Sequence, residues 1–160
     1  MLMRRGRRSK AAVASATIVA VALLALGTAT AAPIARASRT VMLNESGHLH
    51  LTSKHTITLN EQGTASGTIK GTIYIHLRIA NNHGGVTAEV NIYPSGGSLS
   101  GSGLASYHVN GAYAVFSGSL AITRGTGGYA HARASSLRFT GSIQRRSDAV
   151  SVQLSGPLSV

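Results

Sequence analysis

The sequence predicts an all-β protein: a small antiparallel β-barrel of about eight strands that follows an N-terminal signal peptide. Three observations carry this expectation. Apolar and polar residues alternate strictly in two neighbouring segments, and no segment after residue 38 shows the periodicity of an amphipathic helix. Turn-forming residues also recur about every 8–12 positions, which is typical of a sandwich or a barrel.

Residues 1–37 have the three parts of a secretory signal peptide. Basic residues gather in the first ten positions, a long uncharged stretch follows, and Ala35-Arg36-Ala37 forms an A-x-A cleavage site. We expect cleavage after Ala37, with Ala31 as the alternative site. An uncleaved membrane anchor is the other interpretation, because the uncharged stretch is long enough to span a bilayer. The domain 38–160 is expected to be secreted or extracytoplasmic, with no stable membrane insertion after cleavage.

The charge of this domain is smaller than that of the whole chain. Nine Lys and Arg residues and four Asp and Glu residues follow position 37, a net charge of +5, whereas the whole chain has +11. The cations are scattered, so we expect no nucleic-acid partner and regard an anionic cell-surface polymer as the more fitting electrostatic partner. The chain has no cysteine, so its stability depends on a packed core, and thiol chemistry is excluded.

The best-defined element is a β-hairpin over residues 72–93. Residues 72–79 alternate with period two, and residues 86–93 repeat the pattern after an Asn- and Gly-rich turn. Apolar residues face each other only if the paired positions sum to an odd number. We therefore predict Ile79 opposite Val86 and His76 opposite Glu89.

The rest of the domain is predicted to form ten further short strands. They are residues 40–43, 48–52, 56–59, 64–69, 104–109, 112–116, 120–123, 129–134, 137–143 and 149–154. Turns are expected at Asn60-Glu61-Gln62-Gly63, Gly125-Thr126-Gly127-Gly128 and Gln144-Arg145-Arg146-Ser147. The segment 95–103 is almost all Ser and Gly, so it is either a flexible loop or a strand whose small side chains allow close backbone approach.

The segment 119–141 resembles a hairpin of a known superfamily. Its residues Gly125-Thr126-Gly127-Gly128-Tyr129-Ala130-His131-Ala132 are similar to the G-T-G-x-Y-x-x-A hairpin of the allene oxide cyclase and dirigent-like β-barrels. The resemblance implies an eight-stranded antiparallel barrel with a ligand-sized cavity, and a homo-oligomer is a further expectation from it. It carries no catalytic set over to this chain.

The residues themselves predict no catalytic set and no cofactor. The four carboxylates of the domain, Glu45, Glu61, Glu89 and Asp148, are far apart in the sequence, so no acid/base pair stands out. No serine lies in a nucleophile elbow, and the Gly-rich segments lack the helix that a phosphate loop requires. We therefore lean against an enzyme.

One polar cluster is the candidate ligand-binding site. It lies on the polar face of the predicted hairpin and consists of Tyr74, His76, Arg78, Glu89, Asn91 and Tyr93. If this face lines the lumen of a barrel, it supplies polar groups and rings around a cavity. If it faces water, the same residues form ordinary cross-strand pairs, which is the favoured interpretation for an antiparallel sheet.

A second cluster contains the residues that would form a metal site. His48 and His50 share one face of a strand, and His55 would return from the next strand to complete a zinc or copper site. We expect no metal here, because the two imidazoles suffice as the polar face of a strand.

Three classes of function remain open. The first is non-catalytic binding of a small apolar or amphipathic ligand in the barrel, which is our leading prediction. The second is a structural or cell-surface interaction protein with a packed barrel. The third is a cyclase- or isomerase-like enzyme of the allene oxide cyclase type.

Overall fold

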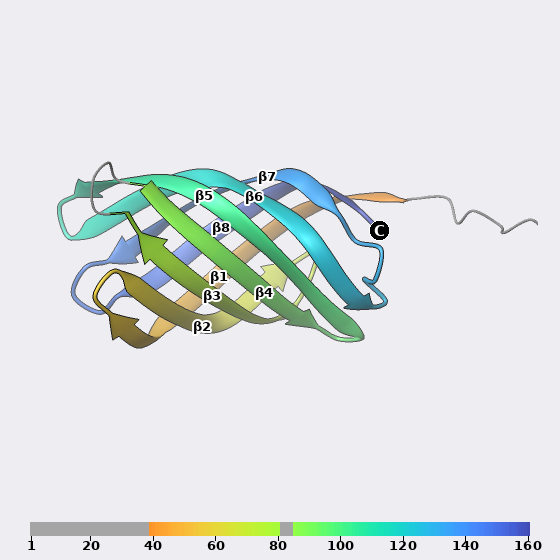
Figure 1. Ribbon diagram of the computed structural model, residues 1–160, viewed down its shortest axis with the longest axis horizontal. Coiled ribbons are helices and arrows are strands. Elements are labelled where there is room, and N and C mark those ends of the chain that lie inside the picture. Colours follow the sequence, from red (N-terminus) through yellow and green to blue (C-terminus); the bar gives the residue numbers. More distant parts are fainter. Residues whose placement is uncertain (1–38, 81–84) are drawn as a thin grey trace, which may run out of the picture. The chain divides into compact units, whose positions relative to one another are not determined.

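Eight antiparallel strands form a closed barrel in the computed structural model, which describes residues 39–80 and 85–160 (Figure 1). The strands are β1 (Thr40–His55), β2 (Thr58–Gly67), β3 (Gly71–Ile79), β4 (Gly85–Pro94), β5 (Gly97–Asn110), β6 (Tyr113–Gly127), β7 (Ala134–Gln144) and β8 (Ala149–Ser159). The predicted fold class is therefore confirmed. The predicted signal peptide, residues 1–37, lies outside the described residues.

The strands follow one another around the barrel in chain order, and β8 pairs with β1 to close it. Two ends result. The distal end carries the β1–β2, β3–β4, β5–β6 and β7–β8 connections. The terminal end carries the other three connections, together with Arg39 and Val160, whose backbone groups hydrogen-bond to each other.

The register of the β3–β4 hairpin agrees with the prediction. Ile79 pairs with Val86 and His76 pairs with Glu89. The period-two pattern succeeds here because β3 and β4 carry an unbroken apolar series on the lumen side.

Elsewhere the strands are longer and fewer than predicted. The segments 40–43 and 48–52 are both parts of β1, and the turn expected at Asn60-Glu61-Gln62-Gly63 lies inside β2. The segment 95–103 is not a flexible loop, because most of it belongs to β5. Gly and Glu occupy lumen positions in these strands, so hydrophobicity alternates only weakly there and the sequence pattern resembles that of turns.

The turn between β6 and β7 also lies later in the chain than expected. β6 continues through Gly127, the turn follows it, and β7 begins at Ala134 rather than at Tyr129. The Gly-rich motif is therefore mainly the end of a strand, where Gly125 and Gly127 pair with Leu99 and Gly97 of β5. The turn at residues 145–148 lies close to where it was predicted.

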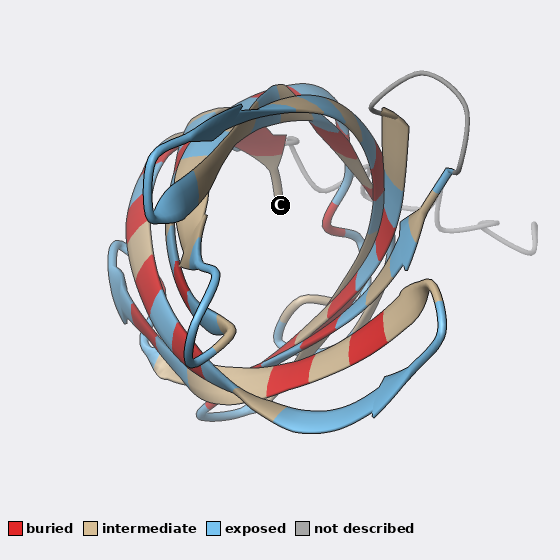
Figure 2. Ribbon diagram, turned by 90° about the vertical axis from the view of Figure 1, so that its left-hand side faces the viewer, coloured by how far each residue is buried: buried red, intermediate tan, exposed pale blue. Residues whose placement is uncertain are grey.

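Buried and exposed residues alternate along much of each strand (Figure 2), because successive side chains of a strand point to opposite faces of the sheet. The inward set forms one continuous apolar core, which includes Leu43, Ile73, Val90, Leu120 and Leu154. The outward set is mostly Ser, Thr, Asn and charged residues.

No helix long and apolar enough to cross a bilayer occurs within residues 39–80 and 85–160.

Candidate functional site

Two apolar cavities lie inside the barrel. The first, of about 60 Å³, occupies the middle of the lumen. Its walls include Ile75, Val90, Leu120 and Leu154. The second, of about 80 Å³, lies nearer the distal end, between residues of β3 to β7. The lumen is therefore neither completely packed nor one large pocket.

Four side chains separate the cavities and belong to the walls of both: Leu77, Ala88, Phe116 and Phe139. The two phenylalanine rings contact each other with centroids 6.1 Å apart and planes tilted by 57°. A Cβ atom on Gly141 would overlap the ring of Phe116, so the ring can occupy this position only because residue 141 has no side chain. The two rings therefore lie between the two spaces and contribute to the walls of both.

Two of the four carboxyl groups of the described chain lie in this lumen. Glu45 on β1 and Glu61 on β2 are 5% and 1% exposed. Glu61 pairs with Leu51 of β1, six residues beyond Glu45, so the backbone positions of the two residues are offset by roughly 20 Å along the strand direction.

Glu45 has a structural role at the terminal end. Its Oε1 atom accepts a 2.7 Å hydrogen bond from the backbone N–H of Ile69, in the connection between β2 and β3. Gly67 pairs with Glu45, and a side chain at Gly67 would collide with the carboxyl group. Burial raises the pKa of Glu45, and the hydrogen bond from Ile69 opposes this effect.

Glu61 has no comparable role. Neither carboxyl oxygen has a hydrogen-bond partner among the described residues. Burial is the main cause that raises the pKa of Glu61 to about 7; the negative charge of Asp148 adds to the rise, and the positive charge of Lys54 opposes it. Near neutral pH this carboxyl group is therefore partly protonated.

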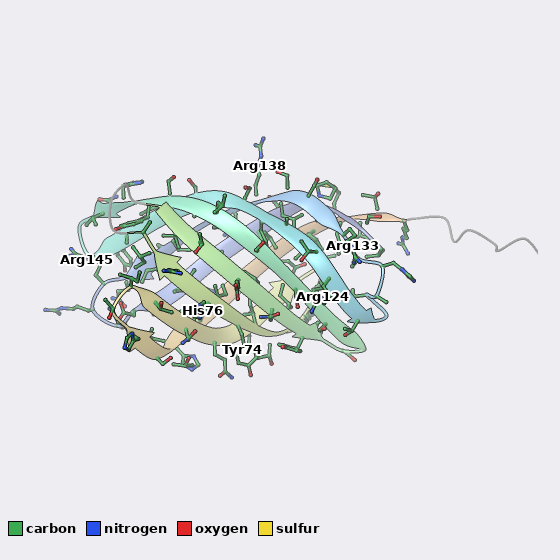
Figure 3. All side chains as sticks on the ribbon, viewed as in Figure 1. Tyr74, His76, Arg124, Arg133, Arg138 and Arg145 are labelled. Carbon is green, nitrogen blue, oxygen red and sulfur yellow. The ribbon has the colours of Figure 1, made fainter. Side chains whose placement is uncertain are left out.

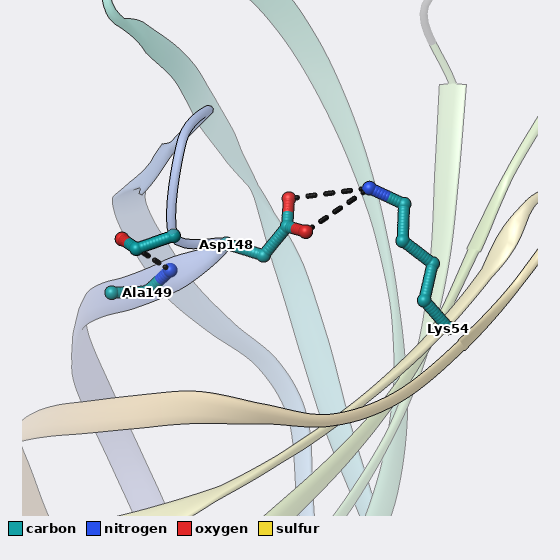
Figure 4. Close-up of polar contacts among 4 residues, drawn as sticks. Lys54, Asp148 and Ala149 are labelled. Atoms are coloured by element: carbon teal, nitrogen blue, oxygen red, sulfur yellow. Dashed lines mark hydrogen bonds and ion pairs between the residues drawn. The ribbon is translucent and has the colours of Figure 1, made fainter.

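A β-bulge brings Lys54 to the mouth above Glu61. The register of β1 and β2 shifts between Leu51 and Ser53, so Lys54 pairs with the inward-facing Leu59. The Lys54 Nζ atom lies 3.1 Å from Oδ2 of Asp148, in the turn before β8 (Figure 4). This ion pair links β1 to the β7–β8 turn beyond Leu49 and Val150, the last residues that the two strands pair.

The six predicted ligand-binding residues do come together, but on the outside of the barrel. Five of them are exposed and Asn91 is half-buried. Tyr74 points away from the barrel in Figure 3 and is 42% exposed. The alternative in which this face lines the lumen is therefore wrong, because Ile73, Ile75 and Leu77 occupy the inward positions of β3.

On the outer surface these residues form cross-strand contacts. The rings of Tyr74 and Tyr93 meet edge to face, 5.7 Å apart. His76 hydrogen-bonds Asn60 of β2, and the hydroxyl of Ser100 donates to Asn91 over 2.7 Å. A ligand inside the barrel would not touch this surface.

The three histidines do not converge. His48 and His50 share the outer face of β1 as predicted, but His55 ends the same strand instead of returning on the next one. Five residues of strand separate His55 from His50, roughly 16 Å. Among residues 39–80 and 85–160 no three His, Cys, Asp or Glu side chains are grouped to hold a metal ion.

The sequence did not reveal that Glu45 and Glu61 face the lumen. A usable signal was present for Glu45, because Leu43, Glu45, Gly47 and Leu49 share one parity in β1. The corresponding signal for Glu61 was masked, because its neighbours Asn60, Gln62 and Gly63 favour a turn.

Comparison with protein-family models, with curated proteins and with solved structures gives no match to this chain.

Proposed function

We propose that this small β-barrel binds a small apolar or slender amphipathic molecule in its lumen. The observation that carries the proposal is the pair of neighbouring apolar cavities at the centre of a closed barrel. The interior of a folded protein is normally packed to near-crystalline density, so two adjoining empty spaces in one small core call for an occupant.

The size of the cavities limits that occupant. A cavity of about 150 Å³ is large enough for benzene, whereas drug-sized ligands need several hundred Å³. Each cavity here is smaller than that, at about 60 and 80 Å³. The ligand is therefore a single small apolar group, or a slender molecule that occupies both cavities after Phe116 and Phe139 shift.

Xenon is a suitable probe, because it enters apolar cavities without needing a polar partner. We expect saturable changes in the NMR shift of dissolved ¹²⁹Xe on addition of the protein. Ala88→Leu should abolish them, because Ala88 lines both cavities. Ala121→Leu is the matched control, since Ala121 lies on the outer surface. Equal xenon binding by all three proteins would overturn the proposal.

A second candidate function, contact with an anionic cell-surface polymer, is supported by the charge of the outer surface. All nine Lys and Arg residues of the described chain are exposed, whereas Glu45 and Glu61 are buried in the lumen. Only Glu89 and Asp148 remain to balance the cations, and Asp148 is already paired with Lys54. The outer surface of the barrel is thus more positive than the net charge of +5 for the whole domain suggests, because two of the four acidic residues lie in the lumen.

The cations are spread over the barrel, as Arg124, Arg133, Arg138 and Arg145 illustrate in Figure 3. Such a distribution fits a long flexible polyanion better than a compact anionic ligand. We expect the protein to be retained on an immobilised polyanion at low salt and released by moderate salt. Elution at the same salt concentration as a neutral protein of similar size would exclude this function.

Export and the absence of stable membrane insertion remain proposals that rest on residues 1–37 and on the polarity of the barrel. The outer face is polar and the lumen apolar, the reverse of a transmembrane barrel. N-terminal sequencing of the product from a secreting host tests the cleavage sites. The cyclase-like activity and the homo-oligomer rest only on the resemblance.

A further inference from the structure

We propose that Glu61 is the polar anchor of the lumen and selects ligands that carry a protonated amine on a small apolar group. This inference rests on the proposed lumen-binding function and names its ligand class.

The first support is the position of Glu61. Its cross-strand partner Ile75 lines the central cavity, and the next inward residue of β3, Leu77, lines both cavities. A cross-strand partner lies about 5 Å away between Cβ atoms, and its diagonal neighbour about 7–8 Å away. Glu61 itself is part of neither cavity wall, so its carboxyl group reaches a ligand there only through a change of side-chain rotamer.

The second support is the absence of any structural reason for this carboxyl group. Burial of a polar group without a hydrogen bond costs free energy, and an unpaired buried charge costs more. One oxygen of Glu45, Oε1, accepts the N–H of Ile69, whereas its Oε2 and both oxygens of Glu61 lack a partner among the described residues. A ligand that supplies the missing donors would offset this cost.

The third support is the charge near the carboxyl group. Lys54 pairs with Leu59, two residues before Glu61 in β2, and its Nζ atom is already bound to Asp148 at 3.1 and 3.3 Å. The negative charges of Glu61 and Asp148 thus outnumber the positive charge of Lys54 at this end of the lumen. An ammonium group brings three N–H donors and the missing charge, whereas a carboxylate ligand would be repelled.

The test compares three ligands with the same chain length and a different polar end: n-butylamine, 1-butanol and butyrate. Calorimetric titration of the full chain at pH 8, where Glu61 is ionised, should give a dissociation constant for butylamine at least tenfold lower than for butanol. Butyrate should bind more weakly than either. Glu61→Gln should remove the preference for the amine, and Glu89→Gln, the matched control on the outer surface, should keep it. If Glu45→Gln removes the preference instead, Glu45, which lines the central cavity, is the anchor and the assignment of Glu61 is overturned.

The outcomes separate the two proposals. If xenon and butanol bind but butylamine binds no better, the assignment of Glu61 is wrong and the lumen-binding function stands. If neither xenon nor any of the three ligands binds, the lumen-binding function fails. If Glu61→Gln keeps the preference for the amine, the amine binds elsewhere and the assignment is overturned. If that variant does not fold, the three ligands are compared on the unmodified protein at pH 5.5, where Glu61 is protonated, and an undiminished preference for the amine there overturns the assignment.

Discussion

Glu61 carries a buried carboxyl group that has no hydrogen-bond partner among the described residues. It occupies a lumen position of β2 between Leu59 and Gly63, and it is 1% exposed. A leucine there would extend the apolar wall without any cost of desolvation. The carboxyl group therefore reduces the stability of the empty barrel.

The pH dependence of stability follows from the pKa of Glu61, which the fold raises from 4.5 to about 7. The folded state thus binds this proton more tightly than the unfolded state. The contribution of Glu61 is most favourable below about pH 4.5 and is lost as the pH rises through 7.

We expect the free energy of unfolding of the unmodified protein to fall by roughly 3 kcal/mol relative to Glu61→Gln between pH 4.5 and 8. Thermal or denaturant melts of both proteins at several pH values measure this difference, because every other ionisable group is common to the two proteins. Parallel pH profiles would show that Glu61 ionises in the folded state as it does in water.

At the scale of the elements, the β6–β7 turn shows how backbone constraints are distributed among neighbouring glycines. Gly127 has φ = +58°, and a Cβ atom on it would overlap the carbonyl oxygen of Gly96. A Cβ atom on Gly97 would overlap the carbonyl oxygen of Thr126. Gly128 has neither constraint, because its nearest such neighbour is 3.8 Å away and its φ is not in the left-handed region.

We therefore predict that Gly127→Val destabilises the protein by about 1–3 kcal/mol, and that Gly97→Val has a comparable cost. Gly128→Val should cost much less. Thermal melts of the three variants decide between these expectations. An equal loss at Gly128 would mean that the turn, rather than the β5–β6 pairing, requires glycine.

The same elements show why the sequence predicted the architecture better than the strand boundaries. Residues 72–93 alternate cleanly, so even the pairing of His76 with Glu89 could be predicted. In β1, β2 and β5, lumen positions hold Glu or Gly, and a bulge after Leu51 reverses the parity of β1. The alternation of apolar and polar residues cannot predict the inward face of a strand at such positions, because the inward side chain is missing or polar, or because a bulge shifts the alternation.

At the scale of the whole molecule, the position of the candidate site depends on which face of each strand points into the barrel. That face is determined only when the whole sheet closes. The residues predicted for ligand binding are neighbours, as expected, but closure of the sheet places them in water. The two cavities form where Gly, Ala and Phe residues from distant strands become neighbours. No local pattern in the sequence indicates which of these residues will be in contact.

We expect Phe139→Ala to join the two cavities. Loss of a large core side chain should cost about 3–5 kcal/mol. The variant should in return bind benzene, which the separate cavities of the unmodified protein are too small to hold. Calorimetry with benzene, together with melts in its presence and absence, checks both effects. If benzene does not stabilise the variant, the lumen collapses around the substitution instead of opening.

The pairing of β1 with β8 also governs how the chain reaches its native state. Seven of the eight ladders join consecutive strands, whereas this one joins Thr40 to Ser159 across nearly the whole described chain. A seam between such distant segments has a high entropic cost of closure, so we expect it to form last in refolding. Until then both edge strands can pair with another molecule, and the inner face of β1, with Glu45, is still hydrated. Acidic conditions, which protonate that carboxyl group, should therefore speed the closing step.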